Sequence, residues 1–382
     1  MKKYLALTLA LIMVLAMFAG CGKTETKTEA PKAETKVEEK APAAETKTEE
    51  KAPEAAPVDD GKDENGYYKL DKKETYSMGC GGTSGTQYVY MSAMATIVNG
   101  KVNNLELVPE TTTGGVQNLQ FLQSGDVSMG QVEQSSAWER YTGEGIVGGE
   151  EVFTDIRAMF PCYTQKFMCC TTSPDLKWFP DLADGKYKIA LSTHGGSIYT
   201  SFIRFAEFYG INNWEDFAQP SVLADTFNQI GEGTFDGMMG IWGHPSSPLL
   251  EYGTNSSYPK LYHPEPPTEE IDKIIEAYPY YARVTIPKEM YTTLESDYHT
   301  FGAWSFVYGT TEMSQETVFN ICKATFENIE DLIATVSSAS ETLPENCLDS
   351  IVPLHAGTVE YLVSIGIDVP AELIPAEYVA KN

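Results

Sequence analysis

Apolar and polar positions alternate with two different periods along the chain from about residue 74 onward. Short apolar runs at residues 75–78, 105–108 and 188–192 have the length and composition of buried strands. The segments between them show helical spacing. Residues 88–98 place five apolar side chains near one face at that spacing: Tyr90, Met91, Met94, Ala95 and Val98. Strands that alternate with helices predict parallel sheets and an α/β fold.

The same patterns predict the remaining elements. Helices are expected over residues 116–124, 135–141, 199–209, 271–278 and 314–330. Strands are expected over residues 156–160 and 165–171, and turns that lead into short strands over 125–131 and 235–242. The long helix at 314–330 has an apolar face formed by Val318, Phe319, Ile321, Cys322 and Phe326.

Three of the predicted strand-to-helix turns are rich in glycine and hydroxyl residues. They occupy residues 79–86 (GCGGTSGT), 111–118 (TTTGGVQN) and 193–197 (THGGS). Glycine permits sharp turns and close approach of a ligand to the backbone, and a helix start presents unpaired N–H groups with a partial positive charge. Since ligands of such sheets bind beyond the carboxyl ends of the strands, we expect the three loops to converge on one small anionic or zwitterionic molecule.

Residues 1–21 have the features of an export signal. Lys2 and Lys3 precede an apolar run at residues 4–18, which is shorter than the ~20 residues of a membrane span. The ending, residues 18–21, resembles a bacterial lipobox with Phe18 in place of the usual leucine. That resemblance implies that Cys21 becomes a lipidated N-terminus at the outer face of the cell membrane. The alternative is a plain secretory signal with a chance cysteine.

Residues 22–66 are rich in Thr, Glu, Lys, Ala and Pro and contain few large apolar side chains. Such a segment cannot bury enough apolar surface to offset its chain entropy, so we expect a disordered tether. A spacer without any role would have the same composition.

Charge and cysteine content exclude some classes of function. The chain has 54 acidic and 27 basic residues and a formal net charge of −27, which argues against a nucleic-acid partner. If Cys21 is lipidated, six of the seven cysteines remain, and an even number permits disulfides that the sequence cannot assign. Cys169 and Cys170 lie in an apolar run that suits buried thiols. No zinc-like spacing or paired histidines occur, so no metal or cofactor is predicted.

The ordered motifs resemble the TAXI-type solute-binding proteins of TRAP transporters. The motifs are residues 81–88 (GGTSGTQY), 112–126, 131–133 (QVE), 233–237, 278–281 (YPYY), 286–291 and 353–361. The resemblance covers most of residues 74–368. Residues 194–197 and 131–133 depart from the usual patterns of that family, which bears on the identity of the ligand.

The resemblance implies a two-domain clamp of the type II periplasmic-binding-protein-like fold. The first domain would comprise residues 70–163 and 282–382, and the second residues 164–281, with a hinge of two crossover strands. A solute of the glutamate, glutamine or dicarboxylate class would bind between the domains and pass to TRAP membrane permease subunits.

The candidate ligand-binding residues come from the three loops and a neighbouring strand. They are Gly82, Thr83, Gly85, Thr86 and Tyr88; Thr113, Gly115, Val116 (through its N–H) and Asn118; Gln131 and Glu133; and His194, Ser197 and Thr200. Glu133 would accept an ammonium group, or else be a solvated or helix-start carboxylate. His194 would contact ligand or only cap its helix. Next to prolines, His244 and His355 suit structural roles, and Trp242 and Trp138 are expected near the cleft.

Nothing in the sequence indicates catalysis. The chain has no GxSxG, HExxH, phosphate-loop or dinucleotide-binding pattern. The alternatives to a TRAP receptor are the substrate-binding lipoprotein of an ABC importer, a ligand sensor for a membrane kinase, or a surface adhesin with a vestigial cleft.

Overall fold

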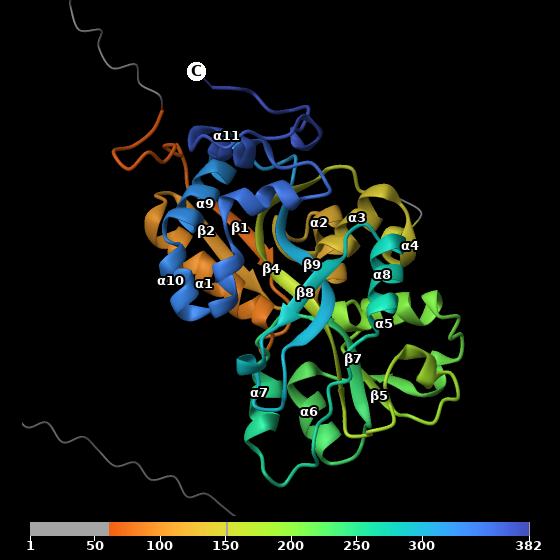
Figure 1. Cartoon of the computed structure of the whole chain (residues 1–382). Coiled ribbons are helices and arrows are strands. Elements are labelled where there is room, and N and C mark those ends of the chain that lie inside the picture. Colours follow the sequence, from red (N-terminus) through yellow and green to blue (C-terminus); the bar gives the residue numbers. More distant parts are fainter. Residues whose placement is uncertain (1–60, 150–151, 382) are drawn as a thin grey trace, which may run out of the picture. The chain divides into compact units, whose positions relative to one another are not determined.

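The computed structural model describes residues 61–149 and 152–381, which form one mixed β-sheet with helices packed against it (Figure 1). These residues belong to one compact unit, Val58–Asn382. The predicted export signal, Cys21 and most of the predicted tether lie outside the described residues. Within residues 61–149 and 152–381, no helix is both long and apolar enough to cross a bilayer.

The sheet has nine strands, and two of them run through its centre. The strands are β1 (Glu74–Gly79), β2 (Leu105–Glu110), β3 (Met129–Glu133), β4 (Ile156–Thr171), β5 (Ile189–Leu191), β6 (Ala218–Pro220), β7 (Gly237–Trp242), β8 (Ala282–Ile286) and β9 (Tyr298–Thr310). Their order is β2-β1-β3-β9-β4-β7-β5-β6, and β8 pairs with β9. We call β2-β1-β3, with the loops and helices attached to these strands, the first half, and β6-β5-β7, with its loops and helices, the second half.

Each half repeats the same arrangement of three parallel strands, with the first strand in the middle. The long strands β4 and β9 pair antiparallel with each other and with the neighbouring half. This order confirms the predicted α/β fold of the periplasmic-binding-protein-like type II class. The predicted parallel pairing is found within each half, whereas the sheet as a whole is mixed, because the two long strands run against their neighbours.

Eleven α-helices connect or cover the strands in the described part of the chain. They are α1 (Thr86–Lys101), α2 (Gly115–Ser124), α3 (Gln134–Thr142), α4 (Gly145–Gly148), α5 (Ser197–Phe208), α6 (Leu223–Gly231), α7 (Ser247–Thr254), α8 (Thr268–Ala277), α9 (Gln315–Glu327), α10 (Ile329–Thr335) and α11 (Ala356–Ser364). The predicted apolar faces of α1 and α9 are buried, as expected. The helix predicted over residues 314–330 ends at Glu327, and α10 begins two residues later.

Strand β4 is one continuous element, whereas the sequence predicts two strands separated near Pro161. Proline lacks an N–H donor and usually interrupts a central strand. Here the register against β9 shifts between Ala158 and Phe160 and again between Pro161 and Tyr163. These irregularities accommodate the proline without ending the strand.

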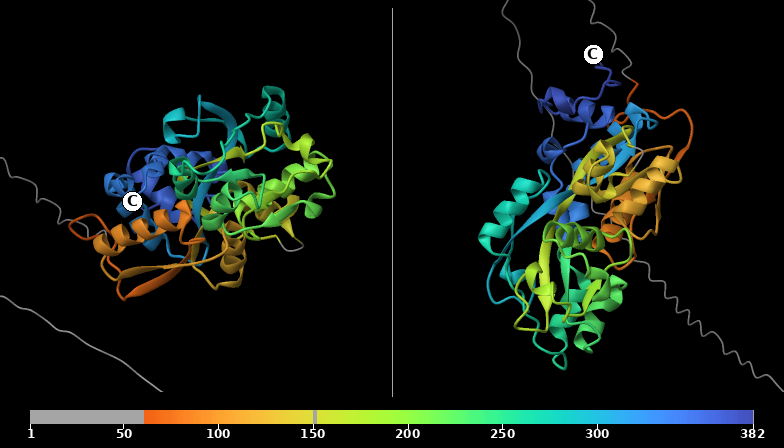
Figure 2. Two further views of the ribbon diagram at one scale, coloured as in Figure 1. Left: turned by 90° about the horizontal axis from the view of Figure 1, so that it is seen from below. Right: turned by 90° about the vertical axis from the view of Figure 1, so that its right-hand side faces the viewer.

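The buried side chains form one cluster around the first half and two around the second. The first cluster combines early residues up to Tyr163 with late residues from Phe306 onward. Both views in Figure 2 accordingly show the orange and blue segments together. The side chains of Ile286 and Phe301 pack with the second half. The predicted domain boundary at 281/282 therefore falls inside the clusters of the second half, and the chain returns to the first cluster only after Ala303.

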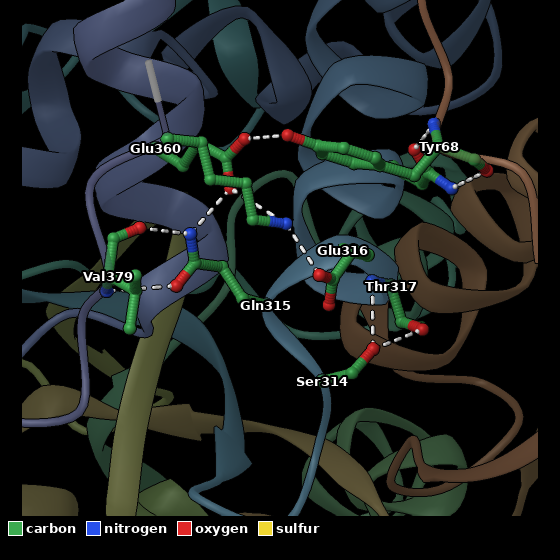
Figure 3. A network of polar contacts seen from close by, with 9 residues as sticks. Tyr68, Ser314, Gln315, Glu316, Thr317, Glu360 and Val379 are labelled. Atoms are coloured by element: carbon green, nitrogen blue, oxygen red, sulfur yellow. Dashed lines mark hydrogen bonds and ion pairs between the residues drawn. The ribbon is translucent and has the colours of Figure 1, made fainter. Parts of the chain in front are cut away.

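Both ends of the folded unit are attached to helices of the first half (Figure 3). The Tyr68 hydroxyl donates a hydrogen bond to Glu360, and the Gln315 side-chain amide donates to Glu360 at 2.6 Å and to the Val379 carbonyl at 2.9 Å. Asp63 closes a turn within the segment that was predicted to be a disordered tether, since its side chain accepts hydrogen bonds from the N–H groups of Asn65 and Tyr67. Ordered structure therefore extends at least six residues further toward the N-terminus than predicted.

The six cysteines among the described residues are free thiols, and all are buried. Burial raises the pKa of the Cys80 and Cys322 thiols to about 12, which keeps them protonated. The buried-thiol interpretation of Cys169 and Cys170 is confirmed.

Candidate ligand-binding site

A cavity of about 300 Å³ lies at the loops that follow β1, β2 and β5. Both halves of the sheet contribute to its wall. The lining residues are Gly81, Gly82, Ser84, Gly85, Thr86, Gln87, Thr112, Thr113, Gly114, Tyr163, Gln165, Ser192, Thr193, Gly196, Ser197, Ile198, Val222, Leu223, Trp242, Gly243 and Ser246. The three glycine loops predicted to share one ligand therefore meet at one cavity.

Two helices from opposite halves begin at this cavity. The sixteen-residue helix α1 starts after Gly85 and the twelve-residue helix α5 after Gly196, and neither has a side-chain cap. Within the described chain, the N–H groups at the first two positions of each helix, 86, 87, 197 and 198, have no hydrogen-bond acceptor. Unpaired N–H groups and two helix dipoles create a positive potential that suits an anion.

The cavity wall carries no charged side chain among its lining residues. Its polar groups are backbone N–H groups, hydroxyls and side-chain amides, while Ile198, Leu223 and Trp242 form apolar parts of the wall. A bound anion would thus be recognised by neutral donors. This agrees with the scarcity of arginine, of which the chain has only four.

Three buried side chains of the wall have polar atoms without a hydrogen-bond partner in the described chain. They are Gln165 Oε1, Trp242 Nε1 and Ser246 Oγ, on residues that are 5%, 3% and 3% exposed. Buried polar atoms are normally paired, so three unpaired atoms around one cavity indicate the position of a ligand or of ordered water.

Gln165 and Ser246 were not among the predicted site residues. Gln165 lies in the middle of β4 and reaches the cavity only because β4 passes between the halves. A glutamine within a mostly apolar strand was the available signal. Ser246 precedes α7, and the serine–proline start of that helix was its signal. Trp242 lines the cavity, whereas Trp138 packs against the Tyr280 ring in the second half's core.

The halves touch directly beside the cavity. The Thr193 hydroxyl donates to the Thr113 carbonyl at 3.2 Å, and the Val116 N–H donates to the Gly195 carbonyl at 3.1 Å. A Cβ atom on Gly114, which has φ +135°, would lie only 2.9 Å from the Gly196 Cα. The N–H group of Val116, predicted to bind ligand, is therefore used between the halves instead.

The predicted residues fall into three groups. Gly82, Gly85, Thr86, Thr113 and Ser197 line the main cavity. Gly115, Val116, Glu133, Thr200 and again Ser197 line a small recess beside it, which we call the annex. The remaining candidates line neither space: Thr83, Tyr88, Asn118, Gln131 and His194.

The Asn118 side chain connects the loops to the strands through hydrogen bonds. Its amide nitrogen donates to the carbonyls of Gly79 and Gln131 at 3.0 and 2.8 Å, and its oxygen accepts a bond from the Thr112 hydroxyl at 2.6 Å. Both polar atoms of this fully buried side chain are hydrogen-bonded within the protein. Asn118 therefore holds the loops in position and does not line the cavity. The Gln131 side chain is also fully buried: its amide nitrogen donates to the Ser305 hydroxyl at 2.7 Å, while its oxygen has no partner in the described chain.

The other three candidates lie at the surface or in the core. Thr83 is exposed in a turn, and Tyr88 is half-buried against the first hydrophobic cluster. His194 is exposed, and its ring lies 4.5 Å from that of Tyr199 rather than in the cavity. His244 is structural as predicted: it contacts the Tyr291 hydroxyl at 2.8 Å, and burial lowers its pKa to about 3.

The annex has a volume of about 10 Å³ and shares the lining residues Gln87, Gln165 and Ser197 with the main cavity. Glu133 faces it with a side chain that is 4% exposed. One carboxylate oxygen accepts a 2.5 Å bond from the Ser135 hydroxyl, and the other has no partner in the described chain. Burial raises the pKa of Glu133 to about 7, although the nearby Arg204 partly opposes that rise.

A buried ion pair connects the halves behind the annex. Arg204 of α5 donates to Glu139 of α3 at 2.9 Å, and both side chains are at most 2% exposed. The hydroxyls of Tyr280 and Tyr281 complete the network at 2.8 Å to Glu139 and 2.9 Å to Arg204. This pair was not predicted from the sequence, because its members are 65 positions apart.

The repeated strand order and the cavity between the halves define a protein of the periplasmic-binding-protein-like class. The chain belongs to the NMT1-like family, whose sequence model matches residues 78–366. The more specific TAXI-type relationship stays a prediction.

Similar folds occur among solved structures. A protein from Bordetella bronchiseptica RB50 is 13% identical, with a TM-score of 0.47 over 80% of this chain and 96% of its own. MatC from Rhodopseudomonas palustris, solved with bound malate, is 11% identical, with a TM-score of 0.46 over 72% and 92%. A putative L-cystine ABC transporter protein from Listeria monocytogenes is 12% identical, with a TM-score of 0.42 over 70% and 98%.

Proposed function

We propose that this protein is an extracytoplasmic receptor that binds a small carboxylate between the two halves of its sheet. In this proposal it is anchored through Cys21 and delivers the solute unchanged to the permease of a TAXI-type TRAP transporter. The ordered motifs over residues 74–368 favour that transporter class, and the solute class they imply is glutamate, glutamine or a related dicarboxylate.

The observation that carries the proposal is the pair of uncapped helix starts, α1 and α5, at one cavity. One helix comes from each half, so a carboxylate bound to both would hold the halves together. Contacts between the halves, such as the Thr86 hydroxyl to the Pro245 carbonyl at 3.2 Å, would form together with ligand binding. We further propose that the halves open and close about β4 and β9.

A thermal-shift screen of carboxylates tests this function. The lipid-free mature chain is mixed with glutamate, glutamine, 2-oxoglutarate, and monocarboxylates and dicarboxylates of increasing length. A ligand that binds only the folded protein at 100 times its Kd stabilises it by about 2.7 kcal/mol, which raises Tm by several degrees. No response to any carboxylate would reject the proposal, whereas a response only outside the glutamate group would reject the solute class alone.

The Ser246→Ala variant tests whether the proposed cavity is the site. Ser246 has a buried hydroxyl that lines the cavity and lacks a partner in the described chain, so we expect its removal to weaken binding of the best carboxylate about tenfold. The Kd is measured from the fluorescence of Trp242, which lines the same cavity.

The matched control is Ser338→Ala. Ser338 also has a buried, unpaired hydroxyl but lies in a 3-10 helix (Ser337–Glu341) and does not line the cavity. The Kd of the Ser338→Ala variant for the same carboxylate should equal that of the unmodified protein. Equal Kd values for both variants would place the ligand elsewhere.

A further inference from the structure

We infer that the annex beside the main cavity is a binding site for one compact monovalent cation, with Glu133 as its counter-charge. The cation is either an alkali ion from solution or the ammonium group of a bound solute. Only the second source rests on the proposed function.

The size of the annex limits its occupant to one small group. Its volume of about 10 Å³ is close to the minimum for a single water molecule. A carboxylate or a second solute molecule would not fit. The space is confined on both sides, because Glu133 and Ser136 come from the first half while Ser197 and Thr200 come from the second.

Two buried side-chain atoms that face the annex are unpaired acceptors. Glu133 Oε2 and Gln165 Oε1 have no partner in the described chain, and their side chains are 4% and 5% exposed. The Thr200 hydroxyl donates to the Gly196 carbonyl at 3.2 Å, which leaves its oxygen lone pairs available. Oxygen acceptors around a small space suit a hard cation or an ammonium group with its three N–H donors. No Lys or Arg side chain is among the lining residues.

The positive end of the α5 dipole at Ser197 opposes a cation, but the side-chain charges around Glu133 favour one. Arg204 is the basic group that acts on Glu133, but it is paired with Glu139 at 2.9 Å. The other titratable groups that act on or sense Glu133 are Tyr281 and Tyr308, whose pKa values burial raises above the usual range, so both are neutral. An ionised Glu133 thus leaves one uncompensated negative charge in a buried space, which a monovalent cation would balance.

Cation binding should depend on pH, because the cation competes with a proton for the Glu133 carboxylate. Without a cation, burial raises the pKa of Glu133 to about 7, so the carboxyl is largely protonated below neutral pH. A cation binds the ionised form and displaces that proton. Its affinity should therefore increase as the pH rises from 6 to 8.

The first arm of the test measures Tm of the lipid-free mature chain at pH 8 in sodium, potassium or choline chloride of equal ionic strength. Choline is too large for the annex. We expect sodium or potassium to raise Tm by about 3 °C relative to choline, and less at pH 6. Glu133→Gln should abolish the increase, while Glu232→Gln, which alters an exposed carboxylate in α6's C-terminal region, should retain it.

The second arm compares L-glutamate with glutarate in choline chloride, because the two differ only by the ammonium group. If the solute supplies the cation, glutamate should bind at least about tenfold tighter, and Glu133→Gln should remove the difference. Should Glu133→Gln fail to fold, Gln165→Leu removes the other unpaired acceptor and should at least halve whichever effect is seen.

A positive result in either arm supports the site and identifies the source of the cation. If the alkali ions have no effect and glutarate binds as tightly as glutamate, the inference is overturned and the annex holds water, while carboxylate binding stands. If neither carboxylate binds, the sodium arm alone decides, so that a failure of the proposed function remains distinguishable.

Discussion

Replacing Glu139 by glutamine is expected to lower the free energy of unfolding by about 3–5 kcal/mol. The change removes the partner of Arg204 and leaves a guanidinium at 2% exposure without a counter-charge. One guanidinium nitrogen, Nη2, already lacks a partner within the described chain, so the remaining contacts cannot compensate. Urea unfolding of the two proteins at pH 7 provides the measurement.

The exposed ion pair between Asp272 and Arg283 is the matched control. Asp272 is 64% exposed, and an exposed pair contributes at most about 1 kcal/mol, so Asp272→Asn should change stability little. In the double variant Glu139→Gln, Arg204→Met both charges are gone, and we expect part of the lost stability to return. If Glu139→Gln costs no more than Asp272→Asn, the pair does not stabilise the contact between the halves.

Local sequence signals were sufficient to predict the three loops and the helices that follow them. Glycine and hydroxyl residues at 79–86, 111–118 and 193–197 mark helix starts, and the alternation of strand and helix fixes the edge of the sheet where they lie. The predicted convergence of these loops on one cavity agrees with the structure. The agreement concerns the position of the loop backbones, which is determined by residues close together in the sequence.

The features that were not predicted depend on contacts between residues far apart in the sequence. The long strand β9 was not predicted, and its antiparallel pairing with β3 and β4 brings the two halves together. In the contact between the halves, the Val116 N–H donates to the Gly195 carbonyl, and Arg204 is buried against Glu139. A glycine turn shows that an N–H group is available at a helix start, but it does not show whether a ligand or another loop will use it.

Asn118 illustrates the same limit. Its position inside a glycine loop suggested a ligand contact, yet its amide pairs with two strand carbonyls and a threonine hydroxyl. A polar side chain in a binding loop can satisfy either the ligand or the loop itself. Only the direction of the side chain distinguishes them, and the sequence does not specify direction.

The contribution of Glu133 to the stability of the protein should fall as the pH rises from about 4.5 to about 7. Its pKa is about 7 in the folded protein and 4.5 in its ordinary state, so the folded form retains a proton that the unfolded form has released. Below pH 4.5 both forms are protonated and the effect vanishes. Above pH 7 the full cost of ionising the buried carboxyl applies, about 3 kcal/mol.

Glu133→Gln removes this titration, so its unfolding free energy should exceed that of the unmodified protein by about 3 kcal/mol at pH 8 and match it near pH 4.5. The curves are measured by urea unfolding in choline chloride, which supplies no cation that fits the annex. Glu232→Gln should follow the unmodified protein throughout, because its carboxylate is exposed. Parallel curves for all three proteins would mean that Glu133 ionises at its ordinary pKa, and that water reaches the annex freely.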